Sequence, residues 1–188
     1  MLFRSTERTM RGELVFETSL RARVALLAGL DAAIVDKVIA ERIKLTPGGP
    51  QLVNTMRAHG AYTALVSGGF TLFTSVIAKK IGFDENRANT LLAENGKFTG
   101  KVAEPILGRE AKFEALVDLR ARRRLVKEET MAVGDGANDL AMIKEAGLGV
   151  AFHAKPAVAA VAAARVDHCD LTALLFAQGY RRAEFTPP

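Results

Sequence analysis

The stretch TMAVGDGANDLAMI, residues 130–143, places two carboxylates, Asp135 and Asp139, close together directly after a short apolar run. Two acidic groups this close repel each other unless a cation lies between them. Glycines flank Asp135, so its side chain has little steric protection, and Asn138 adds an amide oxygen. Such oxygens suit Mg²⁺. The stretch therefore predicts a strand that ends in a metal-binding loop. The alternative is a helix N-terminus capped by Asp135 or Asn138.

Other apolar runs alternate with helical patterns. TALV (63–66), TMAV (130–133) and GVAF (149–152) are strand candidates, and each precedes a glycine or turn and then a helix. This alternation predicts an α/β fold, a parallel sheet with helices on both faces. Asn95-Gly96 within residues 87–102 predicts a β-hairpin, followed by a helix over 110–125. Ligands gather at the C-terminal ends of parallel strands, so the loops after these runs are the functional side.

The N-terminal part has a different character. Residues 13–42 show a helical apolar pattern with a break at Gly29-Leu30-Asp31, and helix breakers crowd together at 46–50. Because such a cluster separates elements, we expect a small helical unit in 1–45 and the α/β core in 46–188.

One further loop and the start of one predicted helix carry candidate binding groups. Ser67, Gly68 and Gly69 follow the first strand candidate and offer a hydroxyl and unhindered N–H groups to a phosphate. The alternative is an ordinary N-cap serine with glycines in a tight turn. Lys112 lies in the first turn of the predicted helix 110–125. It is either a solvent-exposed charge or, if that helix begins beside the strand ends, a group of the site.

Composition predicts an ordinary globular protein. The 188 residues are 49% hydrophobic, which supplies a sizeable core. The longest apolar run, residues 157–164, is far shorter than the roughly 18 residues of a membrane span. The N-terminal segment is too charged for a secretory signal, and the single Cys169 cannot form an internal disulfide. We therefore expect a soluble, cytoplasmic protein with no membrane partner.

The formal net charge of +5 is compatible with anionic ligands. The densest basic cluster, RARRR at 120–124, ends a predicted helix, where cations complement the helix dipole. The alternative is a nucleic-acid surface, which is disfavoured because no aromatic residue interleaves the arginines.

Several motifs occur in the order found in one enzyme family. VSGGF (66–70), AK (111–112), AVGDGANDLAMI (132–143) and AGLGVAFHAKP (146–156) resemble motifs II, III and IV of the haloacid dehalogenase superfamily of phosphohydrolases and the segment that follows them. Residues 10–30, MRGELVFETSLRARVALLAGL, are similar to the helical cap of the phosphoserine phosphatases. ANTLLAENGKFTG (88–100) is similar to their hairpin segment. The resemblance covers nearly the whole chain.

The resemblance implies a HAD-like Rossmannoid sheet with a helical cap, and Mg²⁺-dependent hydrolysis of O-phospho-L-serine in L-serine biosynthesis. It implies that Ser67 and Gly68 hold the phosphoryl group, Lys112 neutralises its charge and Asp135 binds Mg²⁺. Asn138 and Asp139 would orient this cluster. In the cap, Arg23 would pair with the substrate carboxylate, while Met10 and Phe16 would close the pocket. Assembly into a homodimer stays open.

One family motif is absent from residues 1–188. Family members attack phosphorus with an aspartate in D-x-D-x-[ST] at the end of the first strand, and the second aspartate acts as acid and base. The chain has no such motif, and Asp167-His168-Cys169-Asp170 lacks both its spacing and its hydroxyl. We expect the first strand and the nucleophile to lie before Met1, which leaves this chain inactive. A reading frame whose start is placed too late, a truncated product, or a noncatalytic phosphate-binding or interaction module of the same fold would each explain the sequence.

Overall fold

A computed structural model describes residues 16–108 and 110–187. The chain forms two compact units. We call Leu107–His168, together with the described residues up to Ser19, the β5 unit. We call Leu20–Ile106 and Cys169–Pro188 the β1 unit. Each unit contains a parallel sheet of its own, whereas the sequence predicted a single one.

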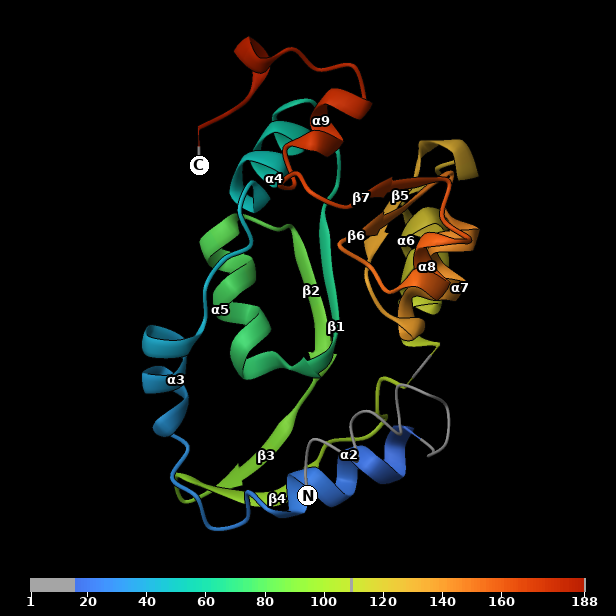
Figure 1. Ribbon diagram of the computed structural model, residues 1–188. Helices are drawn as coiled ribbons and strands as arrows, with labels where there is room; N and C mark the ends of the chain where they lie inside the picture. Colours follow the sequence, from blue (N-terminus) through green and yellow to red (C-terminus); the bar gives the residue numbers. More distant parts are fainter. Residues whose placement is uncertain (1–15, 109, 188) are drawn as a thin grey trace. The chain divides into compact units, whose positions relative to one another are not determined.

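The β5 unit is built on a parallel sheet in the order β5 (Met131–Gly134), β6 (Leu148–Phe152) and β7 (Ala164–Val166). Helices α6 (Ala111–Arg123), α7 (Leu140–Glu145) and α8 (Pro156–Ala159) accompany it (Figure 1). Central strand β6 is buried, with Val150 and Ala151 at most 1% exposed. Ala151 packs with Ile143 of α7 and Val158 of α8. This apolar packing fixes the loops at the C-terminal ends of β5 and β6.

The β1 unit contains a parallel pair, β1 (Ala64–Phe70) and β2 (Glu85–Asn89), connected by α5 (Thr71–Ile81). Helix α4 (Gly49–Ala58) contacts both α5 and α9 (Ala173–Ala177). Leu174 and Leu175 of α9 are buried to 1% or less. Figure 1 shows α5 lying along the β1–β2 pair. The C-terminal segment therefore belongs to the same core as β1.

The predicted hairpin is confirmed as β3 (Leu91–Glu94) and β4 (Lys97–Val102), which pair antiparallel. Asn95 and Gly96 in the turn both have positive φ, 50° and 76°, as a two-residue hairpin turn requires. The helical segment before the core forms α2 (Phe16–Ala25) and α3 (Ile34–Arg42), separated at the predicted break. The break lies against β4, because Gly29 N–H donates to the carbonyl of Phe98 at 2.8 Å.

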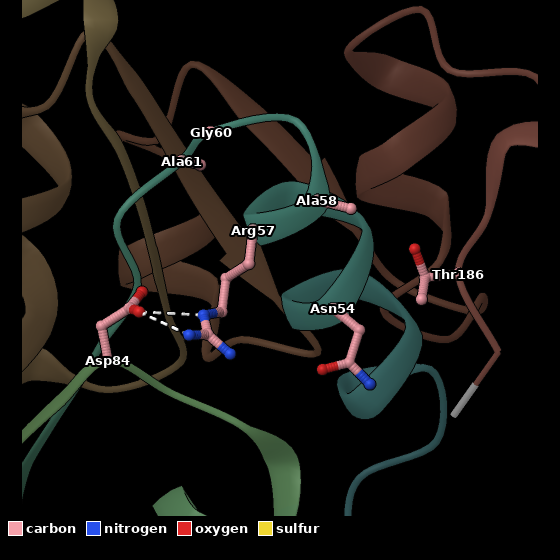
Figure 2. Close-up of a pocket in the computed structure, with 7 residues that line it drawn as sticks. All are labelled: Asn54, Arg57, Ala58, Gly60, Ala61, Asp84 and Thr186. Carbon is pink, nitrogen blue, oxygen red and sulfur yellow. Dashed lines mark hydrogen bonds and ion pairs between the residues drawn. The ribbon is translucent and has the colours of Figure 1, made fainter.

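An ion pair connects α4 to the chain just before β2. Arg57 donates from Nε and Nη2 to Asp84 Oδ1 at 2.9 and 2.8 Å (Figure 2). The other Asp84 oxygen accepts the backbone N–H and hydroxyl of Thr63 at 2.8 and 2.9 Å. Burial raises the pKa of Asp84, but the bonds from Thr63 and Arg57 lower it further, so this pKa lies below its ordinary value. Asp84 thus fixes the chain at the start of β2 to α4 and to the segment before β1.

The predicted α/β class is correct, and the three predicted strands are found as β1, β5 and β6. Helix 110–125 is found as α6. Two strands were not predicted. One is β2, whose sequence ENRAN has no apolar run, and the other is the three-residue β7. Ser67–Phe70, predicted as a loop, instead belongs to β1, because pairing resumes at Phe70 opposite Asn89.

The division into a helical cap in 1–45 and a core in 46–188 stays a prediction. In the part of the chain that the structure describes, no helix is long and apolar enough to span a membrane.

Candidate functional site: the loop after β5

The loop that follows β5 is organised around Asp139. One carboxylate oxygen, Oδ2, accepts the backbone N–H groups of Asp135 and Gly136, each at 3.0 Å. The close approach requires glycine at position 134, since a Cβ there would lie 2.4 Å from the Asp139 Cβ. Asp139 is fully buried, whereas Asp135 is exposed. The loop therefore buries one of the two predicted carboxylates and presents the other to solvent.

Lys112 supplies a cation to the buried carboxylate of Asp139. Its Nζ lies 2.5 Å from Asp139 Oδ1, and the two side chains are 18% and 1% exposed. Lys112 is the second residue of α6, so this helix begins beside the loop after β5. Lys112 is therefore paired rather than a solvent-exposed charge, and its role in the site stays a prediction. The Asp139 carboxylate thus accepts hydrogen bonds from the backbone of the loop and forms an ion pair with Lys112.

The loop after β6 forms a hydrogen bond with the loop after β5. Lys155 N–H donates to the carbonyl of Asp135 at 3.1 Å. His153, between β6 and this donor, has a positive φ of 44°, which non-glycine residues seldom adopt. The adjacent C-terminal ends of two parallel strands are therefore joined by a hydrogen bond, with Asp135 held from both directions.

The capping alternative for this stretch is wrong for the residues it named. A short 3₁₀ helix, Ala137–Asp139, starts after Gly136, and the side chain that accepts the N–H of Gly136 is that of Asp139. Asp135 and Asn138 are exposed. Their side chains are therefore available to a ligand rather than used as the cap.

The loop after β5 offers one exposed carboxylate, that of Asp135, to a metal ion. Within residues 16–108 and 110–187, no group of three or more His, Cys, Asp or Glu side chains could hold a metal ion. Mg²⁺ keeps several waters and commonly uses one or two protein carboxylates, so Asp135 fits as one ligand of an incomplete set. The other acidic side chain of the loop, Asp139, is engaged by Lys112 and the loop backbone.

Ser67 and Gly68 belong to the β1 unit. Ser67 Oγ accepts the N–H of Gly69 at 3.0 Å. The N-cap alternative for Ser67 is wrong, because α5 starts after Phe70 and has no side-chain cap. Sequence reasoning missed Asn89, which is 2% exposed and donates from Nδ2 to the carbonyl of Gly68 at 3.1 Å. Its strand has no apolar pattern, so the sequence carried no signal for this contact.

The predicted cap residues lie on or before α2. Phe16 and Arg23 are half-buried in this helix, and Met10 lies outside the described residues. A cavity of about 470 Å³ in the β1 unit is lined by seven residues, namely Asn54, Arg57, Ala58, Gly60, Ala61, Asp84 and Thr186 (Figure 2). Among the predicted site residues that the structure describes, none lines this cavity.

The basic cluster at the end of α6 is partly neutralised. Arg120 pairs with Glu145 at 2.7 Å, and Arg122 pairs with Asp118 at 3.1 Å. Two of its arginines thus have carboxylate partners, which reduces the positive potential available to a nucleic acid.

The sequence matches the haloacid dehalogenase-like hydrolase family over residues 3–144. This match spans more than half of the chain. The chain belongs to this family.

Its relatives within the haloacid dehalogenase-like family include phosphoserine phosphatases. The chain is 47% identical over 179 residues to the phosphoserine phosphatase of Streptomyces coelicolor, covering 95% of the chain and 43% of that protein. It is 42% identical to the phosphoserine phosphatase of Albidiferax ferrireducens, covering 90% of the chain and 74% of that protein. The chain therefore spans less than half the length of the first of these relatives.

A solved haloacid dehalogenase-like structure has the same fold. It is described as a phospho-aspartyl intermediate analogue of phosphoserine phosphatase, with a TM-score of 0.85 and 39% identity. The match covers 94% of this chain and 84% of that one. The α/β fold predicted from the motifs is therefore confirmed.

Proposed function

We propose that this chain provides the phosphoryl-binding and metal-binding parts of a Mg²⁺-dependent phosphoserine phosphatase, which releases L-serine and phosphate from O-phospho-L-serine. The observation that carries the proposal is the pairing of Lys112 with buried Asp139 beside exposed Asp135. A cation and a free carboxylate at the end of a parallel strand suit phosphoryl transfer, which depends on placement and charge neutralisation. The substrate is inferred from the relatives.

Each residue has a distinct role in this proposal. Lys112 neutralises oxygens of the phosphoryl group, and Asp139 keeps its ammonium in place. Asp135 holds Mg²⁺, which when bound would polarise the phosphoryl oxygens, and exposed Asn138 orients the substrate phosphate. Ser67 and the Gly68 N–H bind the phosphoryl group in the β1 unit.

The cap roles are those that the resemblance to the phosphoserine phosphatases implies. Arg23 would receive the substrate carboxylate, a task suited to a guanidinium because it donates two parallel hydrogen bonds. Met10 and Phe16 would close the pocket. A cytoplasmic location fits a small, diffusible substrate.

The attacking carboxylate must come from elsewhere in this proposal, because residues 1–188 contain no D-x-D-x-[ST]. We propose that a segment outside these residues supplies it. The test is phosphate release from O-phosphoserine by the chain alone and by the chain fused behind a D-x-D-x-[ST] segment of a related phosphoserine phosphatase. Turnover by the fusion and not by the chain alone is expected.

Two controls make this test decisive. The fusion with Asp135→Asn should lose Mg²⁺-dependent turnover, and the fusion whose first motif aspartate is replaced by asparagine should be inactive. Hydrolysis of other phosphomonoesters without hydrolysis of O-phosphoserine would show that the substrate is wrong.

The missing motif also favours a second candidate, a noncatalytic phosphate-binding or interaction module. That candidate predicts calorimetric binding of phosphate or O-phosphoserine by the chain alone, and no turnover by the fusion. Turnover by the fusion would rule out this candidate.

A further inference from the structure

The peptide unit between Gly68 and Gly69 is held at both of its polar groups. Its carbonyl, from Gly68, accepts the side-chain amide of Asn89 at 3.1 Å. Its N–H, from Gly69, donates to Ser67 Oγ at 3.0 Å. The carbonyl and the N–H of a trans peptide point in opposite directions, so the two bonds together fix the rotation of the peptide plane.

Regular pairing between β1 and β2 does not fix the orientation of this peptide plane. The register of β1 and β2 matches Val66 with Arg87 and Phe70 with Asn89. Ser67, Gly68 and Gly69 therefore lie opposite the single residue Ala88, and the parallel ladder is irregular over this stretch. An irregular stretch leaves backbone groups without their usual strand partners. Asn89 lies where pairing resumes, and its side chain supplies a donor to the Gly68 carbonyl within this irregular stretch.

Burying the Asn89 side chain destabilises the fold unless its amide forms hydrogen bonds. The residue is 2% exposed, and a buried amide without partners is strongly unfavourable. An aliphatic side chain could fill the same space beside β1 without that cost. The amide is therefore explained by what it bonds, which includes the carbonyl of the glycine predicted to bind the phosphoryl group.

We infer that Asn89 is a positioning residue that sets the conformation of the phosphoryl-binding stretch Ser67–Gly69. This inference rests on the proposed function. By holding the Gly68 carbonyl, Asn89 keeps a partially negative oxygen turned away from the phosphoryl oxygens, which it would repel. Because Ser67 Oγ already accepts the Gly69 N–H, the hydroxyl proton is left to donate to a phosphoryl oxygen.

The test compares Asn89→Ala and Asn89→Asp with Asn86→Ala in the full chain. Asn86 is on the same strand, and its Oδ1 accepts the hydroxyl of Thr74 on α5 at 3.0 Å. Its replacement removes a hydrogen bond of β2 without touching Ser67–Gly69. Urea unfolding first establishes that the variants are compared under conditions where all are folded.

Two quantities are then measured, the affinity for inorganic phosphate by calorimetry and the hydrogen exchange rate of the Gly69 amide by NMR. Both Asn89 variants should weaken phosphate binding about tenfold and speed Gly69 exchange about tenfold relative to Asn86→Ala, the factor expected for one hydrogen bond. Phosphate affinity and Gly69 exchange equal to those of Asn86→Ala would overturn the inference.

The design separates this inference from the proposed function. If the unmodified chain does not bind phosphate, the phosphoryl site is wrong, and Gly69 exchange alone decides the role of Asn89. Faster exchange in the Asn89 variants supports the inference, and unchanged exchange overturns it.

If the Asn89 variants do not fold, the side-chain amide signals of the unmodified chain are used. The Asn89 amide protons should exchange more slowly than those of exposed Asn138. Equal exchange would overturn the inference.

Discussion

Lys112 Nζ lies 2.5 Å from Asp139 Oδ1, although the two residues are 27 positions apart in the chain. The second oxygen of Asp139 accepts two backbone N–H groups of the loop after β5. A carboxylate with these three donors holds the loop and the first turn of α6 together. Asp139 therefore contributes to folding as well as to the charge distribution of the site.

Replacing Asp139 with alanine should lower the free energy of unfolding by about 2–4 kcal/mol. The change leaves a mostly buried ammonium and two loop N–H groups without their acceptor. The neighbouring exposed residue provides the control, since Asn138→Ala should change stability by less than about 0.5 kcal/mol. Urea unfolding of both variants measures the difference. Equal losses would contradict the anchoring role of Asp139.

Replacing Gly134 with alanine should cost about 1–3 kcal/mol of stability, as overpacking does. Its Cβ would lie 2.4 Å from the Asp139 Cβ and 2.5 Å from its Cγ, and Asp139 is held by three bonds and cannot retreat. Gly49→Ala is the matched control, because its Cβ would meet Leu171 at an ordinary 3.7 Å. Thermal unfolding measures the loss of stability in both variants. Similar losses would show that the loop can shift to accommodate the added Cβ.

Asp84 should make the stability of the chain depend on acid pH. Its pKa in the folded state lies below its unfolded value of about 3.9, so its stabilisation is complete above that value and is lost as the pH falls through the folded pKa. Between about pH 5 and pH 2, the free energy of unfolding should therefore fall more steeply in the unmodified chain than in Asp84→Asn.

The control for this titration is Glu41→Gln. Glu41 pairs with Lys37 at 3.9 Å on an exposed helix face, and such pairs contribute little. Denaturant unfolding at a series of pH values should give this variant the pH slope of the unmodified chain. If Asp84→Asn has the same pH slope as the unmodified chain and Glu41→Gln, the contacts of Asp84 with Thr63 and Arg57 do not make stability depend on pH.

Arg23→Ala should reduce the specificity constant for O-phosphoserine by about 10–100-fold in the fusion that carries D-x-D-x-[ST], because a charge-assisted contact to the carboxylate is lost. Hydrolysis of O-phosphoethanolamine, the same ester without the carboxylate, should change much less. Arg21→Ala is the control on the same helix, since Arg21 is exposed and pairs with Glu104 at 2.6 Å. An equal loss on both substrates would show that Arg23 does not bind the carboxylate.

Elements with strong local signals were predictable from the sequence. The apolar runs of β5 and β6 and the Asn95-Gly96 turn specify their conformations over a few neighbouring residues. The same holds for the amphipathic pattern of α6. These signals placed Lys112 in the first turn of a helix and Asp135 at the end of a strand.

The contacts between distant segments were not predictable in the same way. The pairing of Lys112 with Asp139 depends on where α6 begins relative to β5, which no local pattern specifies. The resemblance implied that Asp139 orients the site, but no local pattern indicated that its Oδ2 accepts two backbone N–H groups of the loop. The contact of Asn89 with Gly68 was hidden because tertiary pairing, and not strand propensity, makes β2 a strand.

The polar sequence of β2 has a further consequence, for aggregation. In the part of the chain that the structure describes, β2 is paired with β1 alone. Its side chains include the ion pair of Glu85 with Arg87. Charged side chains on a strand that ends a sheet discourage the addition of a strand from another molecule. The composition that concealed β2 in the sequence therefore also protects this side of the sheet from pairing with a neighbouring molecule.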